Sequence, residues 1–173
     1  RNHQSLSGNP NIGSDMDGIW GGDPIIATRD YQWKSFAPQM LDMDGWGRYA
    51  KGPYVHGDPY TGVSRMYLKM KAMMMPYIYT NAYAAANLET GNDDQGLPMI
   101  RAMFLEYPDE AYAYTEAGSQ YQYMWSENLL VAPVYQNTQA DEMGNDVRDG
   151  IYLPGGDDQI WIDYFTGQQY PST

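Results

Sequence analysis

The fold prediction begins with residues 11–22, which read NIGSDMDGIWGG. A short strand-like run ends near two acidic residues, Asp15 and Asp17, and glycines then open a loop. Over residues 24–40, apolar side chains recur at three- and four-residue spacing, which predicts a helix that Pro38 ends or kinks. The sequence thus predicts a strand, a loop and a helix in this order.

Two further segments follow this unit. Residues 41–62 form a long loop rich in Gly, Pro, Trp and Tyr. A loop of this length is usually either functional or disordered, and the aromatic residues favour function. Residues 63–88 give the strongest helix pattern, which Pro76 is expected to bend. Because this helix is apolar on nearly all sides, we expect it to be buried.

The pattern changes near residue 96. Short apolar runs then alternate with turn residues, at 97–105, 129–135, 151–153 and 160–165. This is typical of β-structure, so we predict one domain over residues 1–96 and a second over 97–173. We also expect the chain to be a piece of a longer protein.

Composition excludes several classes of function. The 173 residues contain no cysteine, which excludes disulfides, a thiol nucleophile and cysteine-bound metals. A formal net charge of -12 argues against nucleic acid and against an anionic membrane surface, and no apolar run approaches the roughly 20 residues of a membrane span. His3 and His56 have no suitably spaced partners, so no metal is predicted. The 17 Tyr and 5 Trp are compatible with a sugar-binding surface or with an aromatic-rich core.

Asp15 and Asp17 are the first candidate pair of functional side chains. On a strand, residues two apart share a face with Cα atoms roughly 6.5–7 Å apart, a separation seen for carboxylate pairs in glycoside hydrolysis. Two acids beside a turn also serve as turn formers or caps. The spacing alone therefore indicates only that a polyhydroxylated ligand is plausible.

Longer motifs carry a family resemblance. Residues 13–19, GSDMDGI, look like the Gly-His-Asp-Ile-Gly-Gly-Phe segment of glycoside hydrolase family 31, which contains α-glucosidases and α-xylosidases. Residues 29–38, RDYQWKSFAP, resemble its Arg-Trp-x-Gln-x-Gly-x-Phe-x-Pro, and residues 75–80, MPYIYT, resemble its Leu-Pro-Tyr-Leu-Tyr-Thr. The later matches follow in the family's order: GLPMIRA at 96–102, EYP at 106–108, LLVAPV at 129–134, YLP at 152–154 and WIDYFTG at 161–167.

The resemblance implies a place in a larger fold. The chain would supply the last strand and helix of a (β/α)8 TIM barrel, followed by part of a β-sandwich. Barrel enzymes carry their sites at the carboxyl ends of the strands. Asp15, at the end of the eighth strand, would therefore belong to the polar lining of the pocket that binds the sugar.

The resemblance also implies an absence. The family's nucleophile and its acid/base are both Asp residues that precede this segment, so no catalytic residue is assigned in this chain. A retaining mechanism needs two carboxyl groups roughly 5–5.5 Å apart. The resemblance implies no cofactor. We expect the chain to be inactive alone, and to fold poorly alone because one βα unit cannot close a barrel.

A few residues of this sequence differ from the family motifs at positions that would bear on which sugar is bound. Residues 41–43, Leu-Asp-Met, stand where the family usually has Arg-Asn-His, and Met43 cannot donate the hydrogen bond that the family's His makes to the sugar. Asp44 or Trp46 could replace that contact, or the loop could be shifted. The predicted substrate-binding residues are Asp15, Asp17, Trp20, Met43, Asp44 and Trp46.

Three functions remain open at this point. The first is a fragment of a retaining α-glycosidase or transglycosidase, α-glucosidase-like by default, that acts on α-linked oligosaccharides or glycoconjugates together with the remainder of the same polypeptide. The second is an α-N-acetylgalactosaminidase, because a bulky 2-substituent would suit Met43 better than a His. The third is a carbohydrate-binding module without catalysis. The cellular compartment is not predicted.

Overall fold

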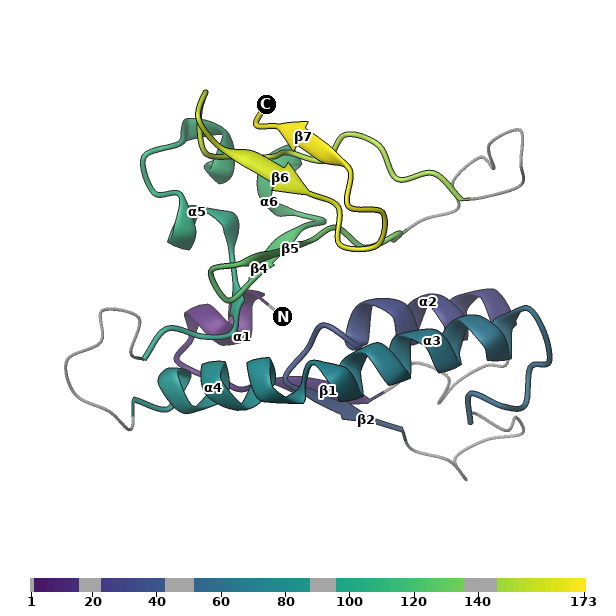
Figure 1. Cartoon of the computed structure of the whole chain (residues 1–173). Coiled ribbons are helices and arrows are strands. Elements are labelled where there is room, and N and C mark those ends of the chain that lie inside the picture. The colour runs from purple at the N-terminus through teal and green to yellow at the C-terminus, as the bar shows by residue number, and fades with distance from the viewer. Residues whose placement is uncertain (1, 16–22, 43–51, 88–95, 136–145) are drawn as a thin grey trace.

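The computed structural model describes residues 2–15, 23–42, 52–87, 96–135 and 146–173. In Figure 1 the segments up to α4 make the lower body, and the strands from β4 onward make the upper one. None of the helices in these described ranges is long and apolar enough to cross a membrane.

The lower body contains a strand–helix–strand unit. Strand β1 (Gly13–Asp15) follows the short helix α1 (Asn2–Leu6), and helix α2 (Pro24–Lys34) leads to strand β2 (Gln39–Leu41). The two strands are parallel and in register from Gly13–Gln39 to Asp15–Leu41. Asp23 caps the amino end of helix α2, because its carboxylate accepts hydrogen bonds from two backbone N–H groups of the first turn.

The helix predicted over residues 24–40 is wrong over its last six residues, 35–40. It ends at Lys34, and Met40 lies in β2. Pro38 disfavours helical geometry in the residue before it and has no N–H to donate. Residues 39–41 instead pair with β1, so the described chain holds two parallel strands in this body, where one was expected.

The long helical segment breaks into two helices. Helix α3 (Tyr60–Met73) packs alongside α2, as Figure 1 shows, and α4 (Met75–Ala85) continues after a break at Met74. Pro76 lies in the first turn of α4, where a missing N–H costs nothing, so the proline coincides with an interruption of the predicted helix. The prediction of burial on nearly all sides is wrong for these helices, because Met73 is 74% exposed and Tyr79 is 72% exposed.

The upper body is built from short elements. Strands β3 (Ile100–Arg101), β4 (Tyr123–Trp125) and β5 (Leu129–Val131) form one antiparallel sheet, and β6 (Ile160–Ile162) pairs with β7 (Gln169–Pro171) in another. The short helices α5 (Met103–Glu106), η2 (Ala111–Tyr114) and α6 (Glu116–Ser119) lie between β3 and β4. These short helices were not predicted. The apolar run at 97–105 was predicted as β-structure, but only Ile100–Arg101 is strand and α5 begins at Met103.

Trp125 joins the two bodies. Its side chain is fully buried, and its ring makes edge-on contacts with Phe36 at 5.6 Å and with Tyr77 at 5.5 Å between ring centroids. The Tyr77 hydroxyl also donates a 2.7 Å hydrogen bond to the Trp125 carbonyl. A single hydrophobic core therefore extends from Ile12 in the lower body to Val131 in the upper one.

Candidate functional site

The carboxyl ends of β1 and β2 define the candidate site. Because Asp15 pairs with Leu41, the two parallel strands end at the same level. In parallel α/β structures the loops that leave the carboxyl ends of the strands build the ligand site. This edge is therefore where the predicted sugar-binding residues are expected to lie.

The predicted site residues fall at or just beyond this edge. The backbone of Asp15 is the last residue of β1, but its side chain is not among the described ones. Asp17 and Trp20 lie outside the described residues, as do Met43, Asp44 and Trp46. Their roles stay predictions that rest on the sequence.

Asp42 is a residue at this edge that sequence analysis did not select. It follows β2 directly, is exposed, and its Oδ2 atom accepts a 2.6 Å hydrogen bond from the hydroxyl of Tyr31. Tyr31 lies on α2 and is only 3% exposed. A buried phenol thus holds a carboxylate at the carboxyl end of β2. The available signal was an acid at the centre of the Leu-Asp-Met departure, but the partner on α2 could not be identified from the chain.

Two lysine side chains make contacts at the carboxyl end of helix α2. The Lys34 ammonium lies 2.6 Å from Asp30 Oδ2, and both side chains are buried. Lys71, on α3, donates a 2.6 Å hydrogen bond to the carbonyl of Ala37, just beyond the end of α2. Burial lowers the pKa of Lys71 from its ordinary value of 10.5 to about 8. These cations lie near Gln39, at the amino end of β2, so they position the unit and do not line the candidate site.

Within the described ranges, no three or more His, Asp or Glu side chains come together in a way that could hold a metal ion.

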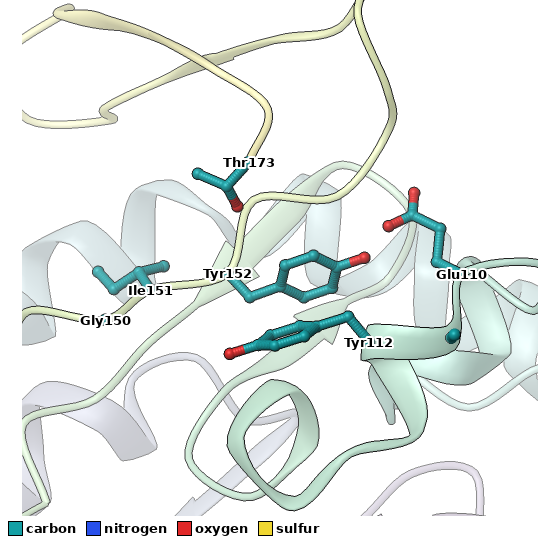
Figure 2. Close-up of a pocket in the computed structure, with 7 residues that line it drawn as sticks. Glu110, Tyr112, Gly150, Ile151, Tyr152 and Thr173 are labelled. Atoms are coloured by element: carbon teal, nitrogen blue, oxygen red, sulfur yellow. The ribbon is translucent and has the colours of Figure 1, made fainter.

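The described surface is hollowed in at least two places. A groove of about 700 Å³ runs between helices α2 and α3 and the strands of the upper body, with Trp33, Tyr67 and Trp161 among its walls. The Arg29 guanidinium and the Asp146 carboxylate meet at 2.8 Å and connect α2 with the upper body. A second cavity of about 530 Å³ lies in the upper body, beside Tyr112 and Tyr152 (Figure 2).

Comparison with known sequences gives two family matches. Residues 2–81 match the TIM-barrel domain of glycosyl hydrolases family 31, and residues 96–173 match the C-terminal domain of the same family. The two matches together cover most of the chain and occur in the order of a barrel followed by a second domain.

Individual relatives agree with these matches. An isomaltosyltransferase of Sporosarcina globispora is 32% identical over 96% of this chain and 14% of its own length. Alpha-glucosidase 2 of Bacillus thermoamyloliquefaciens is 26% identical over 94% of this chain and 18% of its own length.

The fold also resembles solved structures. The cycloalternan-forming enzyme of Listeria monocytogenes, solved with a pentasaccharide substrate, superposes with a TM-score of 0.74 at 27% identity and covers 98% of this chain and 15% of that chain. The chain therefore spans less than a fifth of the length of each of these three relatives.

Proposed function

Because the chain belongs to glycoside hydrolase family 31, we propose that it is a part of a retaining α-glycosidase that cleaves O-glycosyl bonds of α-linked oligosaccharides. Its contribution is one wall of the substrate pocket. The observation that carries the proposal is the parallel pair β1–β2, whose carboxyl ends lie level within the part that matches the family's barrel domain. Glucose units are the default sugar.

The proposed roles follow from position and chemistry. Asp15 and Asp17 accept hydrogen bonds from sugar hydroxyls, because ionised carboxylates are strong acceptors. Trp20 and Trp46 stack against the apolar faces of the sugar rings. Met43 and Asp44, which follow β2, shape the part of the pocket that decides the sugar at the cleaved bond.

The catalytic carboxyl pair is proposed to lie outside this chain, in the remainder of the polypeptide. The exposed apolar side chains of α3 and α4 support a neighbour there. Met66, Met73, Met75 and Tyr79 are each more than half exposed, and exposed large apolar side chains on these helices favour a contact with a neighbouring part of the protein. In this proposal residues 1–96 complete the barrel, residues 97–173 begin the domain behind it, and the chain alone is inactive.

Transfer in place of hydrolysis is a second candidate. The isomaltosyltransferase and the cycloalternan-forming enzyme are named for making glycosidic bonds. A glycosyl-enzyme intermediate can be attacked by a sugar hydroxyl as well as by water, so one site can serve both outcomes. The bond cleaved is an α-glycosidic bond in either case, and an assay decides whether water or a sugar hydroxyl accepts the glycosyl group.

The deciding experiment is an assay of the complete protein on three aryl glycosides, the α-glucoside, the α-xyloside and the α-N-acetylgalactosaminide. Release of the aryl group from the α-glucoside supports the proposal, and chromatography of products from maltotriose then separates hydrolysis from transfer. Preference for the aryl α-N-acetylgalactosaminide would replace the sugar assignment. Sugar binding without release from any of them would leave only the carbohydrate-binding function.

A further inference from the structure

The strand pair β1–β2 has one face that the described helices leave exposed. In β2, Gln39 and Leu41 are exposed, and Met40 between them is half-buried. Side chains alternate between the two faces of a strand, so Gln39 and Leu41 share one face and Met40 belongs to the other. Leu41 is the last residue of β2 and is 50% exposed. A large apolar side chain thus stands uncovered at the carboxyl end of this strand.

The opposite face of the pair lies toward the helices. Asp42 is the residue after Leu41, and its carboxylate accepts the hydrogen bond from Tyr31, a buried residue of α2. Ile12 directly precedes β1 and belongs to the same buried core as Met70 of α3. Helices form the outer ring of a (β/α)8 barrel, and this part of the chain matches such a barrel domain. In the barrel of the proposed function, the face that carries Leu41 is therefore the interior one.

Leu41 is the register partner of Asp15. The pairing of the parallel strands runs from Gly13–Gln39 to Asp15–Leu41, and neighbouring strands lie about 4.8 Å apart. A Cβ atom on Gly13 would overlap the Cβ atom of Gln39, so paired positions of the two strands are in contact on this face. Two residues further along, position 41 shares its face of the sheet with position 15. Leu41 thus adjoins the residue that is proposed to bind the sugar.

The level of a residue along the strand decides what it meets on this face. Side chains inside a barrel fill a packed core, whereas residues at the carboxyl ends of the strands line the active site. Leu41 and Asp15 are the last residues of their strands. Under the proposed function, the neighbour of Leu41 at this edge is the bound sugar, and its exposed side chain is part of the pocket wall.

The residue type at position 41 sets the chemistry of this wall. The family motif has Arg where this chain has Leu41. A guanidinium at this position would pair with a carboxylate, whereas a leucine offers an apolar surface without charge or hydrogen bond. Asp42 adds a fixed carboxylate directly after it. An anionic sugar is therefore repelled at this edge, while the C–H face of a neutral sugar fits against Leu41.

We propose that Leu41 is a specificity-determining residue of the sugar pocket. It forms an apolar wall beside Asp15 and, together with the carboxylates of this edge, makes the pocket select neutral sugars over sugars that carry a carboxylate. A site discriminates between two ligands when it builds repulsion against one of them as well as attraction for the other. The inference rests on the proposed function, because that function places the sugar at the carboxyl ends of β1 and β2.

The test measures binding separately from catalysis. Two ligands that resist hydrolysis are titrated by calorimetry into the complete protein, thio-linked maltose and its analogue with glucuronic acid as the non-reducing unit. The ratio of their association constants is the readout, since partial loss of folding affects both ligands alike. Leu41→Arg introduces a cation, and Leu41→Gln adds polar length without charge. Leu6→Arg is the matched control, because Leu6 is 46% exposed on α1, which precedes the amino end of β1.

The parent protein is expected to bind the neutral ligand at least about tenfold more tightly than the acidic one, because like charges placed together in a binding site are strongly unfavourable. In Leu41→Arg this ratio falls at least about tenfold, as expected for a charge-assisted hydrogen bond to the glucuronate. Leu41→Gln changes the ratio by less than about threefold, as expected for a neutral hydrogen bond. Leu6→Arg leaves the ratio unchanged. If Leu41→Arg does not fold, Leu41→Lys carries the cation on a flexible stem and gives the same prediction.

Three results overturn the inference. A ratio in the cationic variant equal to that of the parent protein means that position 41 does not meet the sugar. An equal fall of the ratio in Leu41→Gln assigns the effect to polarity or bulk and not to charge. Equal binding of both ligands by the parent protein means that the pocket has no preference for neutral sugars. Failure of the proposed function appears separately, as a lack of aryl release from the α-glucoside by a protein whose preference for the neutral ligand is intact.

Discussion

The hydroxyl of Tyr31 donates a 2.6 Å hydrogen bond to Oδ2 of Asp42, which joins the buried face of α2 to the carboxyl end of β2. In Tyr31→Phe this carboxylate loses its donor, and the start of the following loop loses its anchor. We expect an unfolding free energy lower by about 1–2 kcal/mol, since the bond is charge-assisted but the carboxylate is exposed. Urea denaturation measures this loss.

The same variant tests the place of Asp42 beside the proposed sugar pocket. If the bond positions the loop after β2, kcat/KM of the complete protein falls in Tyr31→Phe, and the change is carried by KM more than by kcat. Tyr164→Phe is the control, because Tyr164 is exposed and no hydrogen bond of its hydroxyl is found among the described residues. Stability loss with unchanged KM would show a purely structural bond.

The ion pair of Asp30 and Lys34 leads to a second prediction. These residues stand where the family motif has Trp and Gly, and in this chain the carboxylate and the ammonium lie 2.6 Å apart. Lys34→Met removes the ammonium that lies against the buried Asp30 carboxylate, and breaking a buried pair costs about 3–5 kcal/mol. The free energy of unfolding in urea measures the loss.

A double variant separates charge from packing at this pair. Asp30→Leu combined with Lys34→Met removes both buried charges and recovers most of the loss, because hydrophobic residues of similar volume replace such pairs at little cost. Lys69→Met, on the exposed side of α3, changes stability by less than about 0.5 kcal/mol. Additive losses in the double variant would contradict this account.

Only part of this architecture could be predicted from the sequence. The start of α2 and the interruption of the helix before Pro76 follow from local rules, since a carboxylate cap and a proline act on their nearest neighbours. Strand β2 was missed because Met40 continues a helical spacing locally, and only its pairing with Ser14 in β1 reveals the strand. A contact between strands separated by a whole helix leaves no local pattern.

The candidate site shows the same division. Asp15 could be placed at the end of a strand, because the acidic and glycine residues that follow a strand-like run mark its carboxyl end. The partnership of Tyr31 and Asp42 depends on how α2 packs beside β2, which spacing along the chain does not contain. Helices α3 and α4 were predicted to be buried, but several of their apolar side chains are exposed. Apolar composition indicates that a helix packs against something, but it does not indicate whether the neighbour belongs to this part of the chain.

Lys71 gives a prediction about pH. Its pKa is lowered to about 8 in the folded protein, so between that pH and its ordinary value of 10.5 the unfolded state binds more protons. Stability from this group therefore rises as pH increases through this interval, and is constant below it. We expect the difference in unfolding free energy between the parent protein and Lys71→Met to increase from about pH 8 to about pH 10.

Measuring the difference cancels the tyrosines that titrate in the same range. Burial raises the pKa of Tyr67 and of Tyr77, and these groups remain in both proteins. Urea unfolding at a series of pH values gives the slope. A difference that stays flat or decreases above about pH 8 would show that Lys71 remains charged, held by the carbonyl of Ala37.

Trp125 gives the last prediction, on the coupling of the two bodies. Its buried ring contacts Phe36, which follows α2, and Tyr77 of α4, while its backbone pairs with Ile100 in the upper body. Trp125→Ala should cost about 3–5 kcal/mol, because the cavity it leaves is lined from both sides. Tyr77→Phe, which removes only the hydroxyl bonded to the Trp125 carbonyl, should cost about 1 kcal/mol.

Hydrogen exchange near Ile12 and near Val131 should report the same opening free energy, and both should fall equally in Trp125→Ala, since one core spans both bodies. A loss confined to Val131 would mean that the upper body folds independently of the barrel part.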